Sequence, residues 1–468
     1  MGNAIASGAL LAWPVVTLVL FLTLSTPRAI VASLVGAYLV LPYSVGFDVK
    51  GIPALDKSSI PNIATFLIAL CLAPTGAFRW PRSFWFNLLL IVYVLSPALT
   101  AISNADAISI GTVMLPGMTL NDAISGVVGN AIAVMPMIVG VAMLGSERAH
   151  RDLLWIFVIA ALAYSAPILL EVAKGPYLQA VIYRVDPGGW YEQQIRNGGF
   201  RAIVFIGHGL LVSTFLGLAL LAAAGLWRDK KRIMGVPAVL CAAWIFLILI
   251  LNKSAGALIT VILIAPLLIL LPARRFIKLA LAAGLILVTY PAMRAAGWIP
   301  VETIRTAASS ISKDRAGSLD FRLRNEDVLL DRANQRPLFG WGGYKRNRVF
   351  VVTSWGATTD VTETDGTWII TLGSYGWTGY LSLFGLLCYP FLHIYRLRRA
   401  GLAPATVALL AMLLFNLLDL IPNSSLRPIT WLIAGALAGF TAVRPRLQRP
   451  HGLAHLTGTQ PDRAHRVA

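Results

Sequence analysis

Charged residues are scarce in this chain. Only 13% of its 468 residues are Asp, Glu, Lys or Arg, whereas 57% are hydrophobic and the mean hydropathy is +0.73. A soluble domain carries about 25% charged residues. The composition therefore excludes a soluble globular protein and indicates a membrane protein.

Residues that could build a metal site or a disulfide framework are also few. The three cysteines, Cys71, Cys241 and Cys388, lie in apolar stretches, which predicts packing roles. The six histidines are scattered, and neither a nucleotide-binding glycine motif nor a Ser-His-Asp set is evident. The first apolar stretch has no basic segment before it, so we expect a membrane span there and no cleaved signal peptide.

The basic residues predict how the chain crosses the membrane. The net charge of +18 could indicate nucleic acid as a partner, but its distribution in short clusters at every second loop argues against this. A span needs about 20 apolar residues, and the sequence offers roughly thirteen such stretches. The predicted spans are 8–24, 29–45, 61–77, 84–103, 124–144, 153–171, 202–226, 234–251, 255–272, 276–293, 367–394, 402–421 and 426–443.

The charge pattern and the spans together define a fold class and an orientation. Because basic loops stay in the cytoplasm, we predict that the N-terminus faces outward and the C-terminus faces the cytoplasm. The prediction is an all-α polytopic membrane protein, with residues 1–446 as a single transmembrane domain of about 12–14 helices. Residues 447–468 are polar and basic, which predicts a disordered cytoplasmic tail.

Two predicted extracytoplasmic loops, 172–201 and 295–366, stand apart by their length. The second contains an amphipathic stretch at 326–336, in which Val328, Leu329, Leu330 and Ala333 are expected on one side. This pattern is typical of a helix that lies on the membrane surface or packs over the bundle. Pro337 and the glycines at 340–343 are expected to end that helix.

Arginine is the residue best suited to phosphate, because its planar guanidinium donates two parallel hydrogen bonds and stays charged. Both long loops concentrate arginines. Most of these could bind lipid headgroups or pair with neighbouring carboxylates. Arg201, Arg322 and Arg324 are stronger candidates for binding a phosphate ligand, since each lies where a loop approaches the bundle.

Three further polar residues fall near predicted span ends. Lys253 lies in a short outer turn, where it either binds phosphate or extends its ammonium to the membrane surface. His208 follows Arg201 by two helical turns, so we expect both on one face of a span, although a lone histidine is more often a core residue. Asp419 and Arg427 are expected to form a structural ion pair.

Two carboxylates, Glu363 and Asp365, precede the span that begins near Trp368. A partly desolvated carboxylate there could accept a hydroxyl proton, or Asp365 could simply cap the helix that follows. The cytoplasmic loops are too short for a nucleotide-binding domain, so an enzyme of this shape needs a pre-activated donor from the membrane. A lipid diphosphate fits, because arginines would neutralise the leaving diphosphate.

These residues resemble, in order along 195–395, the motifs of the O-antigen ligase and O-antigen polymerase superfamily. An Arg at the start of a span corresponds to Arg201, and the opening of the large loop corresponds to Arg322-Leu323. The family's Pro-Leu-x-Gly-x-Gly turn corresponds to 337–342, and its small turn is replaced by Lys253-Ser-Ala-Gly256. Small residues of the closing span match Gly373, Gly376 and Gly379, which we expect to face a neighbouring span.

The resemblance implies a bundle similar to the C-type glycosyltransferases and a reaction without metal or cofactor. It implies an inverting glycosyltransferase of the bacterial inner membrane, in O-antigen or exopolysaccharide biosynthesis. The implied partners are a polyprenyl-diphosphate-linked glycan donor, a glycan or lipid-linked acceptor, membrane lipids and other polysaccharide-assembly proteins. Asp365, Arg322 and Arg201 would be catalytic, and Arg324, Lys253 and His208 would bind the diphosphate.

One departure from the family pattern bears on the activity. Ligases carry a His shortly before the closing span, whereas this chain has Asp365 in that place. This difference favours a polymerase over an O-antigen ligase that acts on the lipid A core. A non-enzymatic transporter or flippase for lipid-linked glycans stays open as an alternative. A single large polar outer loop is less typical of such a transporter.

Overall fold

The computed structural model describes residues 4–49, 51–74, 78–185, 194–196, 198–311 and 313–441, so the tail predicted at 447–468 lies outside the described residues. The described part contains sixteen helices. They are α1 (Ala4–Thr23), α2 (Thr26–Val40), α3 (Ser59–Leu72), α4 (Phe84–Ile102), α5 (Leu120–Met143), α6 (Glu147–Lys174), α7 (Leu178–Tyr183), α8 (Gly209–Arg228), α9 (Ala238–Leu251), α10 (Ala255–Leu270), α11 (Ala273–Ala295), α12 (Val301–Ile311), α13 (Lys313–Asn334), α14 (Thr367–Leu397), α15 (Pro404–Asp419) and α16 (Pro428–Ala438).

Strands occur in the described part only as short antiparallel hairpins. They are β1 (Gly46–Phe47) with β2 (Leu55–Asp56), β3 (Ile108–Ile110) with β4 (Val113–Leu115), β5 (Ile195–Arg196) with β6 (Gly199–Phe200), β7 (Arg232–Ile233) with β8 (Val236–Pro237), and β9 (Phe350–Val352) with β10 (Thr358–Asp360).

Every predicted span overlaps a helix, and the predicted fold class is confirmed. By length and composition, α1, α4, α5, α6, α8 and α11 are able to cross a membrane, and α2, α3, α9, α10, α15 and α16 are shorter apolar helices. The chain is therefore an all-α polytopic membrane protein. The predicted span at 202–226 begins too early, because α8 starts at Gly209.

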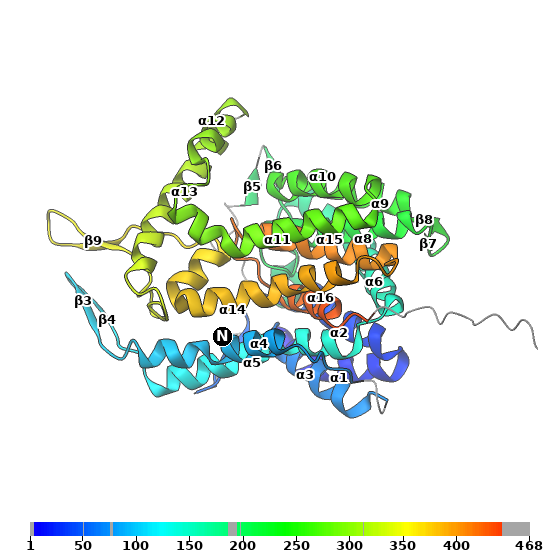
Figure 1. Ribbon diagram of the computed structural model, residues 1–468, viewed down its shortest axis with the longest axis horizontal. Coiled ribbons are helices and arrows are strands. Elements are labelled where there is room, and N and C mark those ends of the chain that lie inside the picture. Colours follow the sequence, from blue (N-terminus) through cyan, green and yellow to red (C-terminus); the bar gives the residue numbers. More distant parts are fainter. Residues whose placement is uncertain are drawn as a thin grey trace, which may run out of the picture.

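Helix α8 is the most buried of the six long apolar helices, with 94% of its apolar segment inside the protein. It packs against α6, α9, α10 and α15. Helices α1 to α5 run along one side of the molecule, and α14 to α16 lie between them and α8 to α11 (Figure 1). Helices α5 and α16 approach so closely that a Cβ on Gly435 would lie 2.2 Å from the carbonyl oxygen of Met137, as small residues permit between spans.

The two ends of the bundle differ in what they carry. Helices α12 and α13 and the hairpins β3–β4 and β9–β10 extend at one end, and hairpin β7–β8 lies at the other (Figure 1). We call these the loop end and the basic end, because β7–β8 directly follows the basic residues at 228–231 and begins at Arg232. The N–H of Thr112 donates to Thr358 Oγ1 at 2.9 Å and so joins the two hairpins of the loop end.

Helix α13 contains the predicted amphipathic stretch and packs on α14. Leu329, Leu330 and Ala333 are buried, as expected, but Val328 is 41% exposed. The buried face of α13 is thus narrower than predicted, and the helix lies over the bundle. It ends at Asn334, shortly before Pro337.

The turn at 337–342 docks onto a break in α14. Gly376 has φ 62° and ψ −164°, a conformation essentially reserved for glycine. The N–H of Trp341 donates to the carbonyl of Gly373 at 2.8 Å, and the N–H of Trp377 donates to the carbonyl of Pro337 at 2.7 Å. The break in the helix therefore exchanges helical hydrogen bonds for bonds to the turn.

The prediction that Gly373, Gly376 and Gly379 face a neighbouring span is wrong. A Cβ on Gly376 would lie 2.5 Å from the backbone of Leu338 in the docked turn. At Gly373 and Gly379 the nearest atoms belong to the side chains of Asn347 and of Tyr375, the latter on α14 itself. The helix break at Gly376 removes the regular spacing on which that prediction depended.

We expect Gly376→Ala to lower the free energy of unfolding by about 2 kcal/mol or more, because Ala is strained at this φ and its Cβ meets the turn. Thermal unfolding in detergent measures the effect. Gly8→Ala is the matched control, since Gly8 lies in α1 with nothing within 4 Å of an added Cβ. Equal melting temperatures for the two variants would contradict the expectation.

Candidate active site

The loop that joins α6 to α8 is held by a single buried carboxylate. Glu171, near the end of α6, is fully buried. Its Oε1 accepts from the N–H groups of Tyr177 and Leu178 at 3.1 and 3.0 Å. Its Oε2 accepts from those of Ile203 and Val204 at 2.9 and 2.7 Å. Four backbone donors that water would otherwise satisfy are thus paired inside the protein.

The turn between α9 and α10 is joined to the same loop through Asn252, which is also fully buried. Asn252 accepts from the N–H of Ala202 at 2.9 Å and donates to the carbonyl of Gly209 and to Ser213 Oγ at 3.2 and 2.8 Å. The position of Lys253, the next residue, is therefore fixed relative to the start of α8.

Three predicted site residues meet at the start of α8. Arg201 is only 7% exposed, and its Cδ lies 1.8 Å from where a Cβ on Gly209 would be. The Nζ of Lys253 lies 2.1 Å from the corresponding position on Gly199, in the hairpin just before Arg201. His208 is the N-cap of α8, and its Nδ1 accepts a backbone N–H of the first turn at 3.1 Å.

The expectation that Arg201 and His208 lie on one face of a helical span is wrong. They do not share a helical face, because residues 201–208 are not helical and α8 begins after them. Glu171 and Asn252 accept the N–H groups that a helix would have used. Arg201 nevertheless reaches the start of α8, because Gly209 leaves room for its side chain.

Arg322 and Asp365 form an ion pair where α13 meets the start of α14. Arg322 Nε lies 3.1 Å from Asp365 Oδ2, and the two side chains are 37% and 44% exposed. Asp365 does not cap α14, contrary to the alternative weighed from the sequence. The N-cap is Gly366, without a side-chain bond, and the N–H of Thr367 donates to the carbonyl of Leu420 at 2.9 Å.

Arg324 and Glu363 lie outside this pair. Arg324 Nε lies 2.8 Å from Asp320 one turn away on α13, and its side chain is 73% exposed. Two residues along a helix turn a side chain by about 200°, so Arg324 faces away from Arg322. Glu363 is exposed, and its backbone N–H donates to Asn325 Oδ1 at 3.2 Å.

Sequence reasoning missed Glu326, one helical turn beyond Arg322. Its Oε1 accepts from Trp368 Nε1 at 3.3 Å, and its Oε2 is buried without a hydrogen-bond partner in the described part of the chain. Burial raises the pKa of Glu326 to about 7, partly opposed by the Trp368 hydrogen bond and the charge of Arg294. The helical spacings 322–326 and 365–368 are the signal that could have paired these residues.

Other arginines of the large loop have structural roles. Arg346 is fully buried, and its Nη1 donates to the carbonyls of Asp106 and Pro116 at 2.6 and 2.9 Å. Its Nε donates to the carbonyl of Trp341 at 3.1 Å. Arg336 Nη2 donates to Asp106 Oδ2 at 3.2 Å. These contacts hold the docked turn against the loop between α4 and α5.

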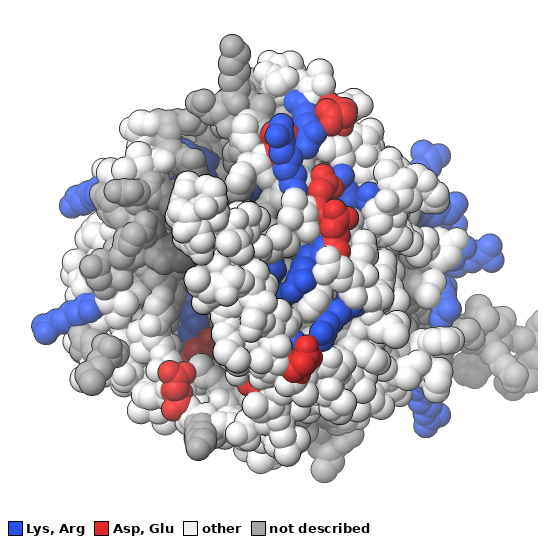
Figure 2. Space-filling model, turned by 90° about the vertical axis from the view of Figure 1, so that its left-hand side faces the viewer, with Lys and Arg blue, Asp and Glu red and all other residues white. Residues whose placement is uncertain are grey.

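The electrostatic surface of the loop end is mixed. Figure 2 shows basic and acidic side chains next to one another in a band across a largely uncharged surface. The arrangement offers buried and half-buried cations for an anion and a carboxyl that titrates near pH 7 for a proton. In the residues that the structure describes, no group of three or more His, Cys, Asp or Glu side chains could hold a metal ion.

Comparison with known protein families finds a match in the second half of the chain. Residues 238–384 match the family described as O-antigen ligase. The match includes Lys253, the Arg322–Asp365 pair, Glu326 and the docked turn. A comparison with curated proteins finds no match. The match supports membership of the O-antigen ligase and polymerase family, whose members are glycosyltransferase-like enzymes.

Glu326→Gln should change how stability depends on pH. Because the pKa of Glu326 is about 7 in the folded protein and near 4.5 when unfolded, the folded form binds an extra proton between these values. Stability of the parent should therefore fall as pH rises from about 4.5 through 7, by at most about 3 kcal/mol for a shift of this size.

The measurement is the melting temperature of parent and variant in detergent between pH 5 and pH 8. The melting temperature of Glu326→Gln should exceed that of the parent, and the excess should grow as the pH rises toward 8. Glu363→Gln is the control, since Glu363 is exposed. Parallel pH profiles for the parent and Glu326→Gln would show that Glu326 does not titrate in this range.

Proposed function

We propose that this protein polymerises saccharide units carried on polyprenyl diphosphate, at the outer face of the bacterial inner membrane. The family match supports glycan transfer of the ligase or polymerase type in general. The Arg322–Asp365 pair supports the finer proposal, because a carboxylate and a guanidinium, a group suited to phosphate, lie together within the matched region.

The reaction we propose is a single displacement that needs no metal. A hydroxyl of the acceptor glycan attacks the anomeric carbon of the donor, and the bond from that carbon to the diphosphate oxygen breaks. Asp365 takes the hydroxyl proton, and the polyprenyl diphosphate leaves as an anion. One displacement inverts the anomeric configuration.

In this proposal Arg322 acts beside the base, and the cations at the start of α8 act on the leaving diphosphate. Arg322 holds Asp365 in place and can turn toward the leaving diphosphate, since both side chains are half-exposed. Arg201, Lys253 and His208 at the start of α8 bind the diphosphate as it forms. Arg324 lies farther round α13 and would contact the diphosphate only at the mouth of the site.

Two features support a polymerase over the alternatives. Asp365 stands where ligases carry a His, which favours a polymerase over a ligase acting on the lipid A core. A flippase would need the arginines but has no use for a carboxylate fixed beside one of them. The Arg322–Asp365 pair therefore favours an enzyme.

Asp365→Asn should abolish most glycosyl transfer while the protein folds normally. Asn keeps the shape and can still accept from Arg322 but cannot take up a proton. Loss of a general base typically costs about 10²- to 10⁴-fold in rate. The assay uses purified protein with lipid-linked glycan extracted from a host that lacks this gene.

Glu363→Gln is the control for this experiment, since it changes an exposed carboxylate two residues away. The folded yield and melting temperature of both variants are measured alongside. Normal turnover by Asp365→Asn would remove Asp365 from the chemistry, and Glu326→Gln would then be assayed in the same way.

The proposed orientation places the loop end outside the cell and the basic end in the cytoplasm. In a variant without the three native cysteines, Gly343→Cys should react with a membrane-impermeant maleimide in cells with a permeabilised outer membrane. Arg232→Cys, in β7, should react only after lysis. Both positions are exposed. The reverse labelling pattern would invert the proposed topology.

A further inference from the structure

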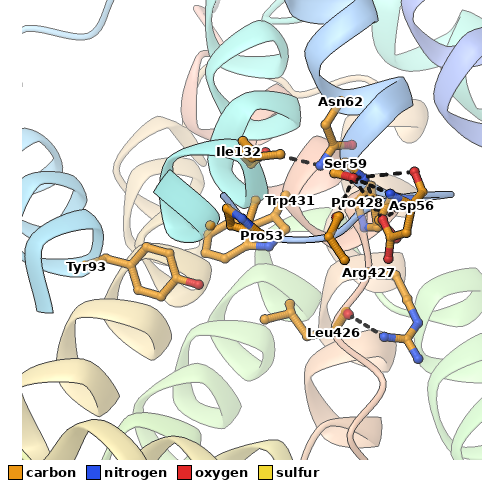
Figure 3. A pocket seen from close by; sticks show the side chains of 14 residues that line it. Pro53, Asp56, Ser59, Asn62, Tyr93, Ile132, Leu426, Arg427, Pro428 and Trp431 are labelled. Atoms are coloured by element: carbon orange, nitrogen blue, oxygen red, sulfur yellow. Dashed lines mark hydrogen bonds between the residues drawn. The ribbon is translucent and has the colours of Figure 1, made fainter. Parts of the chain in front are cut away.

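A cavity of about 270 Å³ lies between the loop before α3 and the start of α16. It is open on one side and lined by the loop before α3, by α3, α4 and α5, and by the start of α16 (Figure 3). Its lining combines aromatic rings with charged and polar side chains. The lining residues that matter here are Asp56, Asn62, Tyr93, Ala133, Arg427 and Trp431.

The aromatic part of the lining is formed by Tyr93 of α4 and Trp431 of α16. Their ring centroids are 5.3 Å apart and the rings are tilted by 50°. The Tyr93 hydroxyl points into the cavity (Figure 3). Both residues are at least nine-tenths buried, so the rings present fixed apolar faces and a hydroxyl to whatever enters.

The charged part of the lining includes an arginine with few partners. The expected Asp419–Arg427 ion pair is absent from the described residues. Asp419 accepts instead from Thr214 Oγ1 and Asn423 Nδ2 at 3.1 and 2.8 Å. The hydrogen bond that the structure gives the Arg427 side chain goes to the carbonyl of its own neighbour, Leu426, at 3.2 Å. Most of its five donors are therefore available to a ligand.

The other polar part of the lining is preformed. Asp56 Oδ1 accepts from the N–H groups of Ser58 and Ser59 at 2.8 and 2.9 Å, which fixes the carboxylate. Its Oδ2 has no hydrogen bond within the described ranges. Asn62 is held in turn by a bond from its Nδ2 to the carbonyl of Ile132 at 3.1 Å.

The cavity is connected to the candidate active site through one segment of chain. Residues 420–423 bond to the start of α14, next to Asp365, through the N–H of Thr367. The same segment continues through Leu426 and Arg427 into the cavity wall. Residues 420–427 therefore link the start of α14, next to Asp365, to the wall of the cavity.

We propose that this cavity is a subsite for one sugar ring of the lipid-linked glycan, a proposal that rests on the proposed function. A drug-sized ligand needs about 300–1,000 Å³, so the volume suits a single ring. Tyr93 and Trp431 would contact its C–H face, and Asp56 and Arg427 would bind its hydroxyls. A lipid chain would leave both charges desolvated, and a phosphate would meet the negative charge of Asp56.

The experiment fills the cavity and measures sugar binding directly. Ala133→Phe places a ring inside it, and Ala131→Phe is the control, since Ala131 is a partly exposed residue of the same helix that does not line the cavity. Tyr93→Phe removes only a hydroxyl from the cavity, so it tests the subsite even if Ala133→Phe does not fold. Saturation-transfer NMR on the full-length protein in detergent uses glucose, galactose, mannose, N-acetylglucosamine and glucuronic acid as probes.

We expect the parent and Ala131→Phe to bind at least one probe, Ala133→Phe to lose that signal, and Tyr93→Phe to bind roughly fivefold more weakly. Binding of no probe by the parent, or undiminished binding by both cavity variants, would overturn the subsite. Glycan transfer by the parent is assayed separately. Transfer without sugar binding refutes only the subsite, and sugar binding without transfer refutes only the polymerase.

Discussion

The structure depends on one constraint: backbone groups that leave helical geometry inside a membrane bundle must find partners within the protein. Glu171 meets it for the loop before α8 by accepting four backbone N–H groups with one carboxylate. The docked turn at 337–342 meets it for the break at Gly376, where the turn and α14 exchange backbone hydrogen bonds. The first of these places of irregular backbone carries the candidate site residues Arg201 and His208.

The same constraint explains how the two groups of site residues are positioned. Arg201 reaches the start of α8 because the preceding backbone is held open by Glu171 and Asn252 and because Gly209 has no side chain. Asp365 does not need to bond the first N–H of α14, because the carbonyl of Leu420 accepts the N–H of Thr367. Partners distant in sequence thus determine where Arg201 and Asp365 lie.

The sequence predicted what is local and missed what depends on distant partners. The spans and the end of α13 before Pro337 follow from runs of apolar residues and from a helix breaker. The start of α8 was placed seven residues early, because nothing local shows that Glu171 and Asn252 will take over its first N–H groups. Glu326 was missed because its burial comes from contact with α14 and α11, not from its own neighbours in α13.

The number of hydrogen-bond partners distinguishes arginines with a structural role from arginines that can bind a ligand. Arg346 is fully buried and donates to several carbonyls, so a ligand could bind it only by dismantling the loop. Arg322 is half-exposed with one carboxylate, which a diphosphate can replace at little cost because the ion pair is partly solvated. Arg427 bonds to the carbonyl of its neighbour, so by the same criterion it can bind a ligand as Arg322 can. The sequence had predicted an ion pair with Asp419 for this residue.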